Sequence, residues 1–298
     1  MNHQEKFRNH IELKYGKHIT NVILDSNKLE LVKGHANQLY NRGLLLKNKE
    51  KVKELIPKYS EQLEENEWAF DFPGWVGELD FKGSHTKEIM VLGMEPHIGK
   101  RDFQVTYGLR ETQSGMFCEL DEYLPNTMLW KNLYGLFGTK SGYRSKEFLN
   151  KFYITDMSHF AVQGKASEML TFKKWKKIRA EVARTFLPQE IELIRPKYIV
   201  SQGNDVADFI EYKFLDKLGK RVAKKTAQEF TTLLPKQCKN SPTFKKYEIF
   251  KTELIHLRLP HVGSPNSNYF WTPAQPENRV KRLSGIANEL IEFEKNRA

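Results

Sequence analysis

Short apolar segments alternate with helical ones from about residue 88 to the end of the chain, and this alternation constrains the fold more than any other feature. Four short runs rich in branched and aromatic residues are typical of buried strands; they cover 88–96, 152–160, 197–203 and 253–261. Helical spacing of apolar residues marks the stretches between and after them, at 126–138, 172–196, 204–218 and 277–297. This pattern predicts an α/β fold of three layers, α/β/α, in which the central layer is a mainly parallel four-stranded sheet.

The first 80 residues have a different pattern. Apolar residues three or four apart predict helices over 28–46 and 49–68, the second kinked at Pro57. No chemistry stands out in this part. We therefore divide the chain into a helical N-terminal extension, 1–80, and an α/β domain, 81–298.

The balance of charge points to a polyanionic partner. The formal net charge is +11 and the isoelectric point is about 9.3, which favours a surface that neutralises phosphates over a merely basic soluble protein. Residues 213–246 hold ten Lys or Arg against two acids. We interpret them as a basic insertion that contacts phosphates, the alternative being a solvated helix face.

Membrane and disulfide chemistry are not indicated. The uninterrupted apolar runs are far shorter than the roughly 20 residues that span a bilayer, and the N-terminus has no apolar signal segment. Two cysteines, Cys118 and Cys238, are too few for a four-cysteine metal site. We expect a cytoplasmic protein that is not associated with a membrane.

Polar and ring side chains follow three of the predicted strands. In parallel sheets ligands bind at the carboxyl ends of the strands, so we expect these residues to form one site. They are Glu95 and His97, Thr155 and Asp156, and His261 and Ser264.

The order and spacing of these strand ends resemble the uracil-DNA glycosylase superfamily. That family has a Gly-x-(Asp/Asn/Ala)-Pro-(Tyr/Gly) motif, an aromatic residue some fourteen positions later, a middle strand ending in Asn, and a late His-Pro-Ser-Pro. The likeness spans about residues 88–297. The corresponding residues are Gly93-Met94-Glu95-Pro96-His97, Tyr107-Gly108, Ile154-Thr155-Asp156 and His261-Val262-Gly263-Ser264-Pro265-Asn266.

The resemblance implies a base-flipping enzyme that breaks the N-glycosidic bond. Glu95 would stabilise the sugar cation and orient the attacking water, a role for which Asp102 is a rival. His261 would donate a hydrogen bond to the base, and Tyr107 would stack on it. Gly93 and His97 would line the base pocket.

DNA contacts are expected at two places. The turn after the last strand would meet the phosphate backbone through amides and hydroxyls, and the basic segment would add charge. The residues are Ser264, Pro265, Asn266, Asn268, Lys220, Arg221, Lys224 and Lys225.

Two departures from the family concern the choice of base. Asp156 stands where uracil-specific members have Asn; a carboxyl group suits the amino group and N3 of cytosine better than it suits uracil. His97 stands where a Tyr excludes substituents at C5. Since excision of ordinary cytosine would destroy the host genome, we expect a 5-modified cytosine, such as the glucosylated hydroxymethylcytosine of some phage DNA.

Three functions therefore stay open. The first is a DNA glycosylase for modified cytosine with a role in antiviral defence. The second is a repair glycosylase that removes uracil or a damaged base, and the third is a non-catalytic DNA-binding module on the same scaffold. For all three we expect DNA as the partner, a monomeric protein and no cofactor. We expect no metal ion, because the sequence has no carboxylate pair or His cluster with ligand spacing.

Overall fold

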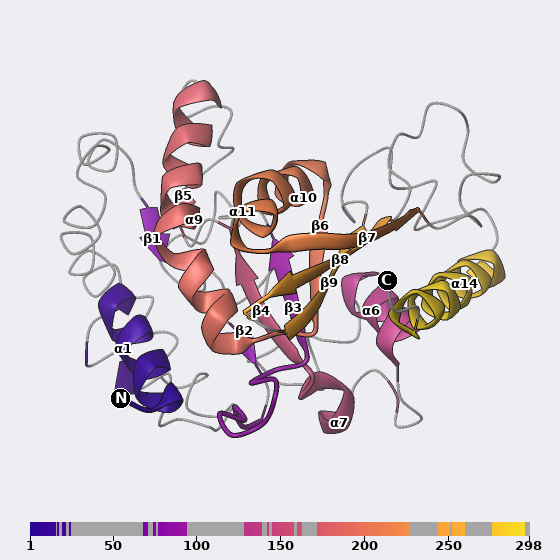
Figure 1. Cartoon of the computed structure of the whole chain (residues 1–298), viewed down its shortest axis with the longest axis horizontal. Helices are drawn as coiled ribbons and strands as arrows, with labels where there is room; N and C mark the ends of the chain where they lie inside the picture. The colour runs from indigo at the N-terminus through magenta and orange to yellow at the C-terminus, as the bar shows by residue number, and fades with distance from the viewer. Residues whose placement is uncertain are drawn as a thin grey trace. The chain divides into compact units, whose positions relative to one another are not determined.

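Figure 1 shows the computed structural model of the chain. Residues group into two compact units, the first from 1–86, 93–123 and 153–195, the second from 87–92, 124–152 and 196–298. The structure describes residues 1–15, 17, 20, 21, 24, 68–70, 74–75, 77–93, 128–138, 142, 145–157, 160–162, 172–226, 243–250, 252–259 and 276–295.

A mixed sheet forms the centre of the second unit. Its strand order is β3-β6-β9-β8-β7, in which β3, β6 and β9 are parallel and β9, β8 and β7 are antiparallel. The α/β class is confirmed, but the prediction of a mainly parallel sheet of four strands is wrong. The strands are β3 (Ile89–Gly93), β6 (Tyr198–Gln202), β7 (Lys220–Thr226), β8 (Thr243–Ile249) and β9 (Thr252–Leu259).

Two helices, α6 (Met128–Phe137) and α14 (Pro276–Lys295), cover one face of this sheet. The Phe137 ring lies 5.3 Å from Tyr198 of β6, and the Phe293 ring lies 5.8 Å from Phe244 of β8. The two helices approach closely at Gly135, where a Cβ atom would lie 2.7 Å from Leu283. The glycine therefore sets how tightly α6 packs on α14.

The opposite face carries a helix that contains a π-helical turn. It runs from α10 (Asn204–Ile210) through a π-helical turn, η4 (Glu211–Leu215), into α11 (Asp216–Leu218). Glu211 of η4 reaches His256 and Lys245, which alternate in register with residues of the first face. Helices thus lie on both faces of the sheet in this unit, with the short α7 (Lys146–Leu149) before β4 (Phe152–Asp156).

In the first unit, α1 (His3–Tyr15) packs on the long helix α9 (Phe172–Ile194). Phe7 is fully buried, and its ring contacts those of Trp75, Phe81 and Tyr153 at 5.5–6.5 Å. His10 lies 3.0 Å from the side-chain oxygen of Gln189 on α9. The N-terminal helix is therefore part of the core of this unit.

Two short antiparallel pairs complete the first unit. β2 (Gly74–Trp75) pairs with β4, and β1 (Trp68–Phe70) pairs with β5 (Phe160–Val162). The strand predicted over 152–160 is thus two strands, which pair with different partners. The helices predicted over 28–46 and 49–68 lie outside the described residues, apart from Trp68, and the domain boundary at residue 80 stays a prediction.

None of the described helices has the length and apolar character needed to cross a bilayer.

Phe7→Ala should lower the free energy of unfolding by about 3–5 kcal/mol, because it removes a buried ring and leaves a cavity among three aromatic neighbours. Urea denaturation followed by tryptophan fluorescence measures this change. Leu13→Ala on the same helix is the control, since Leu13 is 38% exposed and its truncation should cost less than 1 kcal/mol or so. Equal losses for the two variants would contradict the packing described for α1.

Candidate functional site

The ends of β3 and β4 meet in the first unit, and they bring together two residues of the predicted base pocket. The backbone N–H of Met157, just after β4, donates to the carbonyl oxygen of Gly93 at 2.9 Å. Asp156, the last residue of β4, is only 5% exposed. The strand ends therefore carry a buried carboxyl group where the sequence predicts one.

Gly93 makes room for the carboxyl group of Asp156. A Cβ atom on Gly93 would lie 2.0 Å from Asp156 Oδ1 and 3.2 Å from its Cγ, closer than non-bonded atoms approach. Only glycine leaves this space free without moving the Asp156 side chain. The first glycine of the motif and the carboxyl group of the middle strand are thus in direct contact.

The strand that carries Asp156 is fixed by its neighbours. Tyr153 of β4 stacks on Trp75 of β2, with ring centres 5.8 Å apart and planes at 10°. The Tyr153 hydroxyl donates to Glu190 of α9 at 2.6 Å, and both residues are fully buried. β4 is thus tied to both β2 and α9, which restrains the position of its last residue.

Most of the other predicted site residues lie outside the described residues. They are Glu95, His97, Asp102, Tyr107, His261, Ser264, Pro265, Asn266 and Asn268.

The described residues of the basic segment, 213–226 and 243–246, do not form an insertion outside the core. Its described residues form η4, α11 and the antiparallel pair of β7 and β8 in the main sheet. Lys245 and Lys246 of β8 are only 5% and 1% exposed and pair with Glu211 and Glu253, so they are not phosphate contacts.

The predicted DNA-binding residues of β7 lie on the edge strand of this sheet. Lys220, Arg221 and Lys224 are exposed on this strand, and Lys225 follows in the same strand. Arg221 and Lys224 lie opposite Tyr247 and Lys245 in the β7–β8 register, so their side chains project from the face that α10 and η4 cover.

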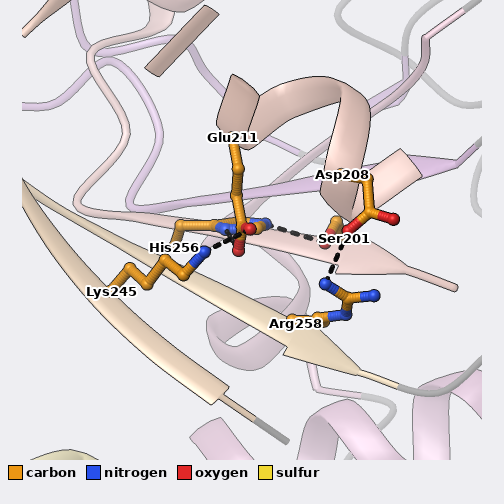
Figure 2. A network of polar contacts seen from close by, with 6 residues as sticks. All are labelled: Ser201, Asp208, Glu211, Lys245, His256 and Arg258. Carbon is orange, nitrogen blue, oxygen red and sulfur yellow. Dashed lines mark hydrogen bonds and ion pairs between the residues drawn. The ribbon is translucent and has the colours of Figure 1, made fainter. Parts of the chain in front are cut away.

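A buried polar network that the sequence did not predict lies between η4 and the sheet of the second unit (Figure 2). The Ser201 hydroxyl is 2.8 Å from His256 Nε2, and His256 Nδ1 is 3.1 Å from Glu211 Oε1. A carboxylate can only accept, so Nδ1 donates to Glu211 and the neutral ring accepts from Ser201 through Nε2. Lys245 donates to the other oxygen of Glu211.

A second ion pair lies beside this network. Arg258, two residues further along β9 than His256, donates to Asp208 of α10 at 2.7 Å (Figure 2). Asp208 is half exposed, whereas the Ser201 and His256 side chains are fully enclosed. The pair therefore marks the solvent side of the contact between α10 and the sheet.

The pKa values of the network follow from its burial. Burial alone would raise the pKa of Glu211, but hydrogen bonds from His256 and Lys245 hold it at about 2. Burial lowers the pKa of His256 below its usual 6.5, although Glu211 acts in the opposite direction. At neutral pH the network therefore contains one carboxylate, one ammonium and a neutral imidazole.

Ser201, His256 and Glu211 have the hydrogen-bond order of a serine-hydrolase triad, but not its accessibility. A nucleophile must touch its substrate, and both Ser201 and His256 have no exposed surface. We assign the network a structural role that joins η4 to β6, β8 and β9. The signal in the sequence is a polar residue within an apolar strand, in YIVSQ and in TELIHLRL.

Among the described residues, no three His, Cys, Asp or Glu side chains gather in a way that could hold a metal ion.

No protein-family model matches the sequence, and no curated protein matches it either.

Glu211→Gln should lower the free energy of unfolding by about 3–5 kcal/mol at neutral pH, because it leaves the buried Lys245 ammonium without a counter-charge. Denaturant unfolding measures this loss. Glu248→Gln on β8 is the control, since Glu248 is exposed.

The same groups set the pH dependence. The native state holds His256 neutral below 6.5 and Glu211 ionised between 4.5 and about 2, where the unfolded chain binds protons. The free energy of unfolding should therefore fall as the pH drops below 6.5, and fall further from 4.5 towards 2. In the Glu211→Gln variant, the loss of unfolding free energy between pH 4.5 and about 2 should be smaller than in the wild type. An unchanged profile would contradict the network.

Proposed function

We propose that the protein is a DNA glycosylase that flips out a base and hydrolyses its N-glycosidic bond, acting on a 5-modified cytosine. One observation carries the proposal: the buried carboxyl group of Asp156 lies against Gly93 at the adjoining ends of β3 and β4. The resemblance to the uracil-DNA glycosylase superfamily assigns base recognition to these two positions. Their contact supports the assignment, because the resemblance requires the two strand ends to share one pocket.

The reaction places opposite charges on the two products as they separate. The bond between the base nitrogen and C1′ of the sugar breaks, so positive charge grows on the sugar and negative charge on the base. Glu95 or Asp102 would stabilise the sugar cation and orient a water molecule toward C1′. His261 would donate a hydrogen bond to the base. The water would add its hydroxyl to C1′, and its remaining proton would neutralise the departing base. Each preorganised charge of this kind contributes on the order of 10²–10³ in rate.

Asp156 would select the base. Cytosine offers an amino donor at C4 beside an acceptor at N3, whereas uracil offers an acceptor at C4 beside an N–H donor. A carboxylate accepts from the amino group, and a carboxylic acid satisfies both positions of cytosine. A carboxylate would face the C4 oxygen of uracil without a donor, which in a buried site costs about 1–3 kcal/mol.

The basic surface supports DNA as the substrate. Lys220, Arg221 and Lys224 are exposed on β7, and the net charge is +11. Such a surface attracts the phosphate backbone through release of counterions. Phage DNA that carries glucosylated hydroxymethylcytosine would be the natural target, which places the enzyme in antiviral defence.

Asp156→Asn should shift the preference from cytosine-type bases toward uracil by roughly 10- to 200-fold, because the carboxamide provides a donor for the C4 oxygen. Duplexes containing uracil, 5-hydroxymethylcytosine or its glucosylated form are incubated with each variant, and abasic sites are revealed by alkaline cleavage. Asp208→Asn is the matched control, since Asp208 is half exposed on α10; its base preference should equal that of the wild type.

Other outcomes separate the alternatives. Release of uracil alone by the wild type would favour the repair glycosylase over the proposal. Tight DNA binding without any abasic sites would favour the non-catalytic module.

A further inference from the structure

An exposed aromatic ring lies at the basic surface of the second unit. Tyr212, the second residue of η4, is 60% exposed, the highest value among the exposed aromatic residues of the described chain. It is flanked by Glu211, which points inward to His256, and by the exposed Lys213. The π-helical turn thus buries Glu211 and exposes the next residue, Tyr212. Such turns are frequent at functional sites.

One basic side chain lies over this ring, and others are exposed on β7, which pairs with the strand that carries it. The Lys245 ammonium lies 5.8 Å from the centre of the Tyr212 ring, and it is held there by Glu211. Lys224 is the direct partner of Lys245 in the β7–β8 register, so the two side chains project from the same face of the sheet. Arg221 pairs with Tyr247, two residues from Lys245, and therefore projects from that face too. Between Tyr212 and Lys224 the sequence holds four basic residues and one acid, Asp216.

We infer that Tyr212, Arg221 and Lys224 form a binding surface for single-stranded DNA, with Tyr212 as the stacking platform for an unpaired base. Lysine and arginine side chains are sufficient to bind the phosphates of DNA. An exposed aromatic ring adds a contact that a duplex cannot use, because its base faces are already stacked. The inference rests on the proposed function, since it takes DNA as the partner, and it adds which form of DNA this surface receives.

The surface also explains why an edge strand carries so many cations beside a ring. Lysines on an edge strand protect it from pairing with other chains, but that role needs no exposed aromatic residue. A strand of DNA uses both: its phosphates meet Arg221 and Lys224 and its base covers Tyr212.

The test is fluorescence anisotropy with a labelled oligothymidine strand and with a duplex of the same length, over a range of NaCl concentrations. Tyr212→Ala should weaken binding of the single strand roughly 5- to 100-fold, in keeping with the loss of one stacked base, and leave the salt dependence unchanged. Tyr212→Phe should stay within about 2-fold of the wild type, because the ring is kept. Lys224→Ala should reduce the slope of log K against log salt by about 0.7.

Phe250→Ala is the matched control. Phe250 is 46% exposed in the turn after β8, five residues from Lys245 and so roughly 16 Å away along the strand. Its removal should not change binding. Thermal melting should show that Tyr212→Ala folds like the wild type, since the ring is exposed.

Two results would overturn the inference: unchanged single-strand binding by Tyr212→Ala, or equal losses for the single strand and the duplex. Base release by the wild type is measured in parallel. If the wild type releases a base but Tyr212→Ala binds the single strand as tightly as the wild type, this inference alone is overturned. Tyr212-dependent binding without any base release would overturn the proposed function alone.

Discussion

The hydrogen bonds of the Glu211 carboxylate hold the π-helical turn against the sheet of the second unit. The carboxylate is buried, and it accepts hydrogen bonds from His256 of β9 and Lys245 of β8. Its own turn, η4, is thereby fixed against two strands of the sheet, and His256 extends the contact to Ser201 of β6. A buried charge of this kind is tolerated only when its partners are in place, so the network ties the π-helical turn to one register of the antiparallel strands.

That register has consequences at the surface. It sets Lys224 directly opposite Lys245, whose ammonium lies 5.8 Å from the centre of the exposed Tyr212 ring. The same turn that sends Glu211 inward sends Tyr212 outward. A structural device in the interior thus arranges the basic and aromatic side chains that we propose as a DNA surface.

The sequence predicted the parts of the fold that depend on local pattern. The strands near 89–93, 152–156, 198–202 and 252–259 were found because their apolar runs are short and clear. Gly93 and Asp156 of the predicted base pocket lie in contact, and the role of the pocket stays a prediction. β8 was missed because Lys245 and Lys246 resemble a solvated segment. Their partners, Glu211 and Glu253, come close only after folding, so no local pattern shows that these charges are buried.

The central claim is that the chain excises a base whose cytosine-type edge is read by Asp156. The most direct measurement is mass spectrometry of the free bases released from a DNA mixture that offers uracil, cytosine, 5-hydroxymethylcytosine and its glucosylated form in competition. The account predicts that a 5-modified cytosine appears as the free base and ordinary cytosine does not. Release of uracil in its place, or of no base at all, would contradict it.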